Sequence, residues 1–125
     1  MEILDDLQYT REHEWLLVDN GIGTIGITDY AQRELTDITF VELLEVGTTL
    51  TVGGVMGTVD GIKAVSEIYS PVDGTIVEIN TLLENHPELV NDDPYGEGWM
   101  IKIKLTDAVV HDMLTPEEYS ELIQK

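Results

Sequence analysis

Alternation of hydrophobic and polar residues predicts short β-strands through most of the chain. The clearest case is the segment 99–105, where Lys102 and Lys104 alternate with apolar residues and would share one face of a strand. Asn20-Gly21 and Asp60-Gly61 are typical of hairpin turns, since these residues tolerate a positive φ. We expect strands over 15–18, 22–27, 38–44, 55–59, 64–69, 75–79 and 99–105.

Helix signals occur at two places. Thr28 or Asp29 can cap a short helix over 30–35. Thr115-Pro116-Glu117-Glu118 is a capping box with proline at the first helical position, which predicts a C-terminal helix over about 115–124. Between the strands, residues 81–98 are rich in Asn, Asp, Pro and Gly and predict a loop with at most one helical turn. The pattern therefore indicates a mainly β domain with short peripheral helices.

Composition narrows the possible functions. The 125 residues suit one domain, and 25 acidic against 6 basic residues give a net charge of −19, which disfavours nucleic-acid and anionic-membrane binding. The chain has no cysteine, which excludes disulfides and thiolate chemistry. No apolar stretch approaches the roughly 20 residues needed to span a bilayer, and the acidic start is unlike a secretory signal. We expect a cytoplasmic protein, although a mature mitochondrial form would look the same.

Motifs for catalysis or metal binding are weak. The glycines of 21–26 match a dinucleotide fingerprint, but they coincide with a hairpin turn rather than a strand-to-helix turn. The run 91–93 resembles half of a calcium loop without its closing Glu. The histidines are too far apart for a short metal-binding pair and lie at positions 13, 86 and 111. With no nucleophile next to a base, we expect a protein that is not an enzyme and has neither catalytic residues nor a metal site.

Lys63 is the one residue that suggests chemistry. The chain has only four lysines, and this one follows Asp60-Gly61 between two predicted strands, which places it at a hairpin tip. Its neighbours Ile62 and Ala64 are apolar, which is unusual for a turn that only contacts solvent. A primary amine held at an exposed tip is what a modifying enzyme needs to attach a prosthetic arm. A turn lysine that merely faces water is the alternative.

Several motifs around this lysine resemble the H-protein family of the glycine cleavage system. The resemblance covers residues 9–105 in order and implies a flattened β-barrel or sandwich of the lipoyl/biotinyl (barrel-sandwich hybrid) type. It also implies that Lys63 carries lipoate in amide linkage. The matching stretches are Tyr9-Thr10-x-x-His13-Glu14-Trp15, Thr24-Ile25-Gly26-Ile27-Thr28-Asp29-x-Ala31-Gln32, Phe40-Val41-Glu42-Leu43, Lys63-Ala64-Val65-Ser66-Glu67-Ile68-Tyr69-Ser70-Pro71, Glu88-Leu89-Val90-Asn91-x-Asp93-Pro94-Tyr95-Gly96-x-Gly98-Trp99 and Ile101-Lys102-Ile103.

The function that this resemblance implies is carriage within glycine catabolism and one-carbon metabolism. A lipoyl arm would take the aminomethyl group of glycine from glycine decarboxylase to aminomethyltransferase, and dihydrolipoamide dehydrogenase would reoxidise it. A lipoate ligase or a lipoyl/octanoyl transferase would attach the arm. Glu14 and Glu67 match acidic positions that would contact the arm in its cleft, although both could be ordinary surface charges. We expect one monomeric domain over 1–125, with a lipoyl-type core at about 15–105.

The sequence departs from the family pattern close to the lysine. Asp60-Gly61 stands where family members usually have Glu-Ser, and Glu12, Tyr30 and Leu44 replace other usual residues. An H-like lipoyl carrier for another pathway or a lipoate relay therefore remains an alternative, as does an unmodified acidic interaction module. A biotin carrier is disfavoured because that family flanks its lysine with methionines, whereas Ile62 and Ala64 stand here.

Overall fold

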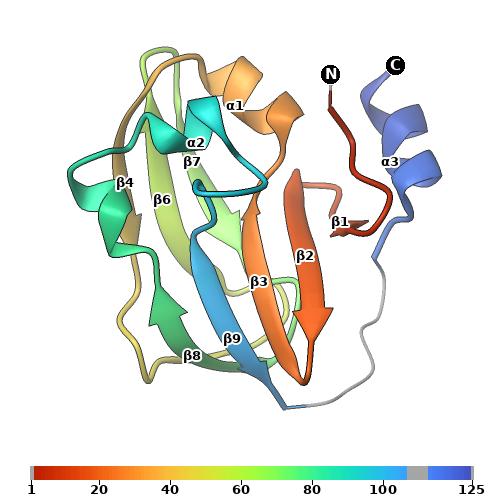
Figure 1. Cartoon of the computed structure of the whole chain (residues 1–125), viewed down its shortest axis with the longest axis vertical. Helices are drawn as coiled ribbons and strands as arrows, with labels where there is room; N and C mark the ends of the chain where they lie inside the picture. Colours follow the sequence, from red (N-terminus) through yellow and green to blue (C-terminus); the bar gives the residue numbers. More distant parts are fainter. Residues whose placement is uncertain (1, 107–112, 125) are drawn as a thin grey trace.

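Two antiparallel sheets form the protein, which a computed structural model describes for residues 2–106 and 113–124 (Figure 1). The first sheet has six strands in the order β1 (Gln8–Tyr9), β2 (Glu14–Asp19), β3 (Ile22–Ile27), β9 (Ile101–Leu105), β8 (Gly74–Ile79) and β5 (Thr49–Leu50). The second has three strands in the order β4 (Ile38–Leu43), β6 (Val55–Gly61) and β7 (Val65–Tyr69). The expected mainly β fold with short helices is confirmed.

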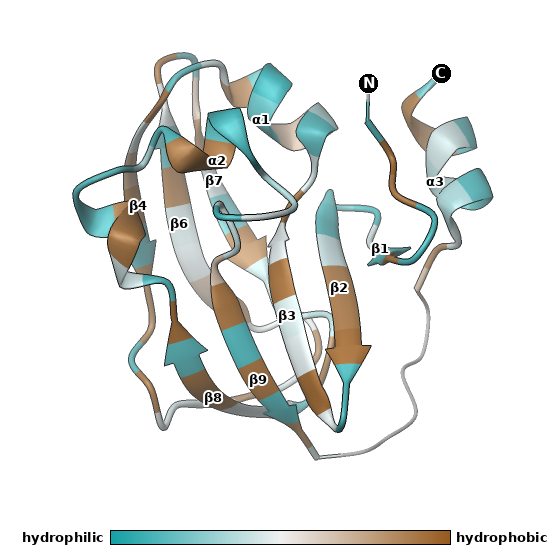
Figure 2. Cartoon of the chain, in the orientation of Figure 1, coloured by the Kyte–Doolittle hydropathy of each residue, from teal (hydrophilic) through white to brown (hydrophobic). Residues whose placement is uncertain are grey.

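The main hydrophobic core lies between the two sheets because alternate residues of each strand point inward. Strand β9 illustrates this: Ile101 and Ile103 are fully buried, whereas Lys102 and Lys104 lie on the other face. Figure 2 shows this alternation as brown and teal bands along β9. The opposite side of the core is supplied by buried residues of the three-stranded sheet, namely Val41, Val59 and Ile68.

A second cluster attaches the C-terminal helix α3 (Pro116–Ile123) beside β1 and β2. The rings of Tyr9 and Tyr119 stack with their centroids 4.6 Å apart. The Tyr119 hydroxyl also lies 2.7 Å from Thr28 Oγ1 and 2.9 Å from His13 Nδ1. Thr115 and Glu118 form the capping box that the sequence predicts. Packing between these aromatic rings therefore holds α3 against one edge of the large sheet.

The remaining helices lie near the ends of the sheets. Helix α1 (Asp29–Leu35) is capped at its N-terminus by Thr28, whose side chain accepts a hydrogen bond from the Ala31 amide. The 3₁₀ turn η1 (Thr81–Glu84) occurs where the sequence predicts one helical turn. Helix α2 (Leu89–Asp92) was not predicted, because its proline- and asparagine-rich surroundings are typical of loops. None of the described helices has the length and apolar character that crossing a bilayer requires.

One turn prediction is wrong. Asp60 and Gly61 do not form the turn before Lys63: both belong to β6 and pair with β4. The hairpin closes later, where the Gly61 amide donates to the Ala64 carbonyl at 2.9 Å. Pairing with β4 extends β6 by two residues, so the turn moves to 62–64. His111, one of the three histidines weighed above, lies outside the described residues.

Candidate functional site

Lys63 lies at the tip of the β6–β7 hairpin. Its side chain is exposed, and among the described residues no ion pair holds its ammonium group. The backbone at the tip is held more firmly, since the Ile62 amide donates to the Asp37 carbonyl at 3.0 Å. A longer contact of 3.5 Å joins the Lys63 amide to the Leu35 carbonyl. The hairpin thus rests on the connection between α1 and β4 while the amine faces outward.

Asn91 of α2 braces that connection. Its amide nitrogen donates to the Thr36 carbonyl and to Gln32 Oε1, each at 2.8 Å. Its amide oxygen accepts from the Ile38 amide at 2.8 Å. Thr36 needs such support because its φ of 61° lies in the left-handed region, which is costly for a β-branched residue. Sequence patterns could not predict this role, because Asn91 meets these partners across more than 50 positions of the chain.

Gly61 permits the close approach of the hairpin to the end of α1. A Cβ at this position would overlap the Leu35 carbonyl oxygen and would lie 2.8 Å from the Leu35 Cβ. We expect Gly61→Ala to lower the free energy of unfolding by about 1–3 kcal/mol, the usual range for overpacking. Urea unfolding should measure the loss. Ala64→Val, which adds two carbons at an exposed position of the same hairpin, should change stability little; equal losses in both variants would contradict this explanation.

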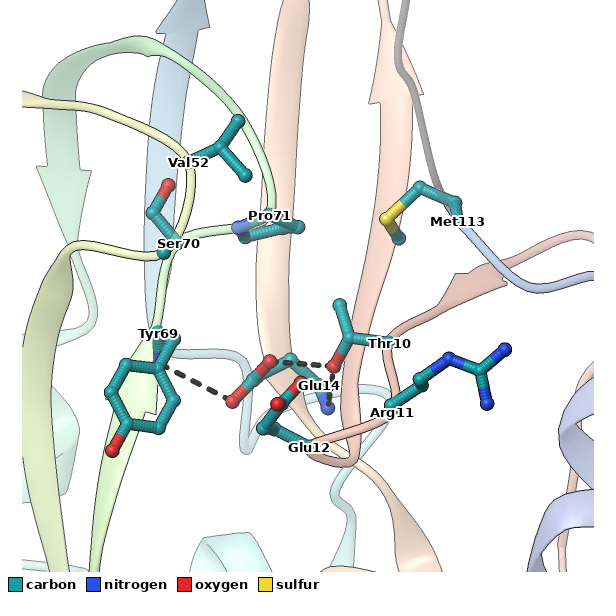
Figure 3. Close-up of a pocket in the computed structure, with 10 residues that line it drawn as sticks. Thr10, Arg11, Glu12, Glu14, Val52, Tyr69, Ser70, Pro71 and Met113 are labelled. Carbon is teal, nitrogen blue, oxygen red and sulfur yellow. Dashed lines mark hydrogen bonds between the residues drawn. The ribbon is translucent and has the colours of Figure 1, made fainter.

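A cavity of about 550 Å³ is lined by Glu14 and lies at the end of β7, at Tyr69, far from the hairpin tip that carries Lys63 (Figure 3). Glu14 shares the inward face of β2 with Leu16, so its carboxylate points between the sheets. The walls of the cavity combine polar, apolar and charged residues. They are formed by Thr10, Arg11, Glu12, Glu14, Val52, Gly53, Tyr69, Ser70, Pro71 and Met113.

Glu14 is only 2% exposed, and its carboxylate accepts hydrogen bonds from two donors. Thr10 Oγ1 lies 2.6 Å from Oε1, and the Tyr69 amide donates to Oε2 at 3.2 Å. Arg11 lines the same cavity, but Figure 3 shows its guanidinium directed away from Glu14. Burial raises the pKa of Glu14 from 4.5 to about 7, and the two hydrogen bonds offset this only in part. The carboxylate can therefore change its protonation near neutral pH.

Glu67 occupies a different place. It is exposed on β7, on the face opposite the buried Ile68, and pairs in register with Thr58 of β6. Neither Glu67 nor Lys63 is among the residues that line the cavity at Glu14. The structure therefore does not bring the two candidate carboxylates together, and the role of each stays a prediction.

The arrangement is suited to presenting an amine and to holding a cation. An exposed lysine stands on a braced hairpin, and a buried carboxylate without a described ion-pair partner lines a separate cavity. Over residues 2–106 and 113–124, no group of three or more His, Cys, Asp or Glu side chains is placed to bind a metal ion. Thr10 and the Tyr69 amide, which hold Glu14, were not found from the sequence because their proximity depends on the fold.

Comparisons with known proteins agree in pointing to one family. The family model described as "Glycine cleavage H-protein" matches residues 7–125. The glycine cleavage system H protein of Rubrobacter xylanophilus is 50% identical over 124 residues, which are 99% of this chain and 97% of the relative. That of Salinibacter ruber is 54% identical over 123 residues, covering 98% and 93%. The crystal structure of a glycine cleavage system H protein from Mycobacterium marinum is 36% identical, with a TM-score of 0.92 over 98% of this chain and 100% of that one.

Proposed function

Since the chain belongs to the glycine cleavage H-protein family, we propose that Lys63 carries a lipoyl group in amide linkage. The family carries lipoate, and the chain is a carrier subunit of the glycine cleavage system, not an enzyme. The observation that supports this attachment site is the exposed ε-amine at the tip of a hairpin whose backbone is hydrogen-bonded to the α1–β4 connection. The relatives' names do not favour the alternative of a carrier for another pathway.

The residues around Lys63 suit an attached arm. A lipoyl group supplies a cyclic disulfide that can accept a one-carbon group together with two electrons. The chain contributes the four-carbon stem of Lys63 as reach and the hydrogen-bonded hairpin as a fixed pivot. Tethering at a fixed point keeps the effective concentration of a cargo high at nearby partner sites. Catalysis then belongs to the enzymes that meet the carrier.

We propose that Glu14 binds the cationic amine of the cargo inside its cavity. An ionised carboxylate accepts a charge-assisted hydrogen bond from an ammonium group, and Val52, Pro71 and Met113 provide apolar walls that limit access of water. The Tyr69 amide and the Thr10 hydroxyl hold the two carboxylate oxygens and so fix the acceptor. Glu67 is proposed as a contact outside this cavity, at the surface of β7.

The chain, as the carrier subunit, works with the enzymes of the glycine cleavage system. We propose glycine decarboxylase, aminomethyltransferase and dihydrolipoamide dehydrogenase as its individual partners, and a lipoate ligase or a lipoyl/octanoyl transferase as the enzyme that attaches the arm. Within this proposal, residues 1–125 act as one monomeric carrier domain in the cytoplasm or, for a mature organellar form, in mitochondria.

Peptide mapping after enzymatic lipoylation tests the attachment site. The purified chain is incubated with lipoate, ATP and a lipoate ligase, and its mass and modified peptides are measured. We expect one lipoyl group per chain, located on Lys63, with none on the β9 residues Lys102 and Lys104. An unchanged mass, or a label on β9, would contradict the proposal. The lipoylated chain should then support glycine–bicarbonate exchange by glycine decarboxylase, whereas failure would favour a different pathway.

A further inference from the structure

The outer face of the three-stranded sheet carries apolar side chains next to Lys63. Because Val41, Val59 and Ile68 point into the core, their neighbours on β4, β6 and β7 point outward. Strand register then aligns Phe40, Asp60 and Val65 in one row across this face. Ile62 follows β6 directly and lies beside Lys63 in the turn.

Three of these apolar residues are unusually open to solvent. Ile62 is 68% exposed, Val65 is 66% exposed and Phe40 is 50% exposed. We call these three residues the hairpin patch. Single exposed apolar residues are common, but a group of large ones around one functional residue is typical of an interaction site.

Carboxylates lie within and next to the hairpin patch. Asp60 lies between Phe40 and Val65 in the same row, and the next row on this outer face aligns Glu42, Thr58 and Glu67. Glu42 and Glu67 are both exposed. A complementary surface would have an apolar centre to cover the patch and Lys or Arg side chains at its border to meet these acids.

We propose that the hairpin patch is the docking surface for the enzyme that acylates Lys63, and that this enzyme presents an apolar contact bordered by basic residues. This inference rests on the proposed attachment of lipoate at Lys63. It adds the surface by which the modifying enzyme recognises the chain and the chemistry of the surface that fits it.

The acylation step itself requires contact at this place. The neutral Nζ attacks the carbonyl carbon of a lipoyl acyl-phosphate anhydride, formed from lipoate and ATP, or of a lipoyl thioester. The C–N amide bond forms and the C–O or C–S bond to the activating group breaks. That group leaves with the electron pair, and the proton that Nζ loses passes to the leaving group or to water. The reacting nitrogen is only four carbons from the Lys63 backbone. The enzyme must therefore approach Ile62 and Val65, whereas enzymes that act on the sulfur atoms work at the far end of the arm.

Charge argues against a second copy of this chain as the occupant. A copy would carry the same carboxylates and the same net charge of −19. Placing the Asp60 and Glu67 rows of two copies together would bring like charges into contact, which opposes association. A basic-bordered enzyme surface meets no such repulsion.

The double variant Ile62→Thr/Val65→Thr tests the docking surface in the full chain. Threonine keeps the β-branched shape suited to strand and turn but replaces a methyl or ethyl group by hydroxyl. With lipoate ligase, we expect KM for the chain to rise about tenfold, which corresponds to about 1.4 kcal/mol, with little change in kcat, because the variant loses interface anchors and keeps the reacting amine. Val46→Thr is the matched control, since Val46 is 57% exposed in the turn after β4 and away from the hairpin.

The outcomes separate this inference from the proposed attachment site. An unchanged KM in the double variant, with wild type lipoylated at Lys63, would overturn the docking surface alone. Absence of lipoylation at Lys63 in wild type would overturn both. A normal lipoylation KM combined with slower glycine–bicarbonate exchange would assign the patch to glycine decarboxylase instead. If sedimentation shows that the wild type is a dimer and the double variant a monomer, the patch is assigned to a second copy of the chain. Assignment of the patch to glycine decarboxylase or to a second copy would contradict the proposal.

Discussion

Lys63→Ala is expected to keep the fold and to lose carrier function completely. The side chain is exposed and makes no described ion pair, so its removal should change the free energy of unfolding by no more than about 0.5 kcal/mol. Without the ε-amine no amide can form, so glycine–bicarbonate exchange should fall to the level without carrier. Lys63→Arg should be equally inactive, because a guanidinium group stays protonated and is a poor nucleophile for amide formation.

Lys102→Ala is the matched control for this prediction. Lys102 lies on β9, 3.8 Å from Glu78 and 5.0 Å from the centre of the Trp99 ring, in the sheet that does not carry the hairpin. The Lys102→Ala variant should lose only the small stabilisation from its exposed ion pair with Glu78. It should retain lipoylation and glycine–bicarbonate exchange. Residual exchange in Lys63→Ala, or loss of its folded circular dichroism spectrum, would contradict the assignment of Lys63 as an exposed attachment residue.

Glu14→Gln is expected to stabilise the protein above neutral pH. In the folded chain the pKa of Glu14 is raised from 4.5 to about 7, so between these pH values the folded state binds more protons than the unfolded state. Stability therefore falls as the pH rises through this window, and the full cost, on the order of 3 kcal/mol, is present above pH 7. Glutamine resembles the protonated acid and can still accept from the Tyr69 amide, so the variant should lack this loss.

Chemical unfolding of both proteins at pH 4, 6 and 8 measures the effect. The stability difference should be small at pH 4 and should grow with pH, because the raised pKa of Glu14 is the cause of the loss in wild type. A pH dependence of Glu14→Gln identical to wild type would show that burial does not control this carboxyl. The neutral glutamine should also hold a cationic cargo less well, which predicts faster loss of the loaded amine by hydrolysis.

Much of the fold could be predicted because the strands alternate regularly. Strands such as β3 and β9 were predicted within about two residues, and the helix cap at Thr115 was found from its capping box. Strands β1 and β5 have two residues each, too few for any periodicity to show. The turn before Lys63 was misplaced because Asp60-Gly61 has turn character locally, whereas pairing with β4, far away in sequence, keeps both residues in a strand.

In the candidate site, too, local features could be predicted and features that depend on long-range contacts could not. Lys63 could be found from its rarity and its place between two strands, since both are local properties. The burial of Glu14 depends on the Tyr69 amide, 55 positions away, and on the closure of the cavity, so the sequence alone gives its position but not its raised pKa. The supporting role of Asn91 depends on contacts with Thr36 and Ile38 that only the folded chain creates.

The Asn91 brace has a consequence for protein engineering. A peptide containing only the β6–β7 hairpin would lack Ile38 and Thr36, whose backbone Asn91 holds, and Asp37, whose carbonyl fixes the turn. To move the modification site into an unrelated protein, three separate segments would have to be transferred: the β6–β7 hairpin, the connection 36–38 and the helix with Asn91. The isolated hairpin should therefore be lipoylated poorly.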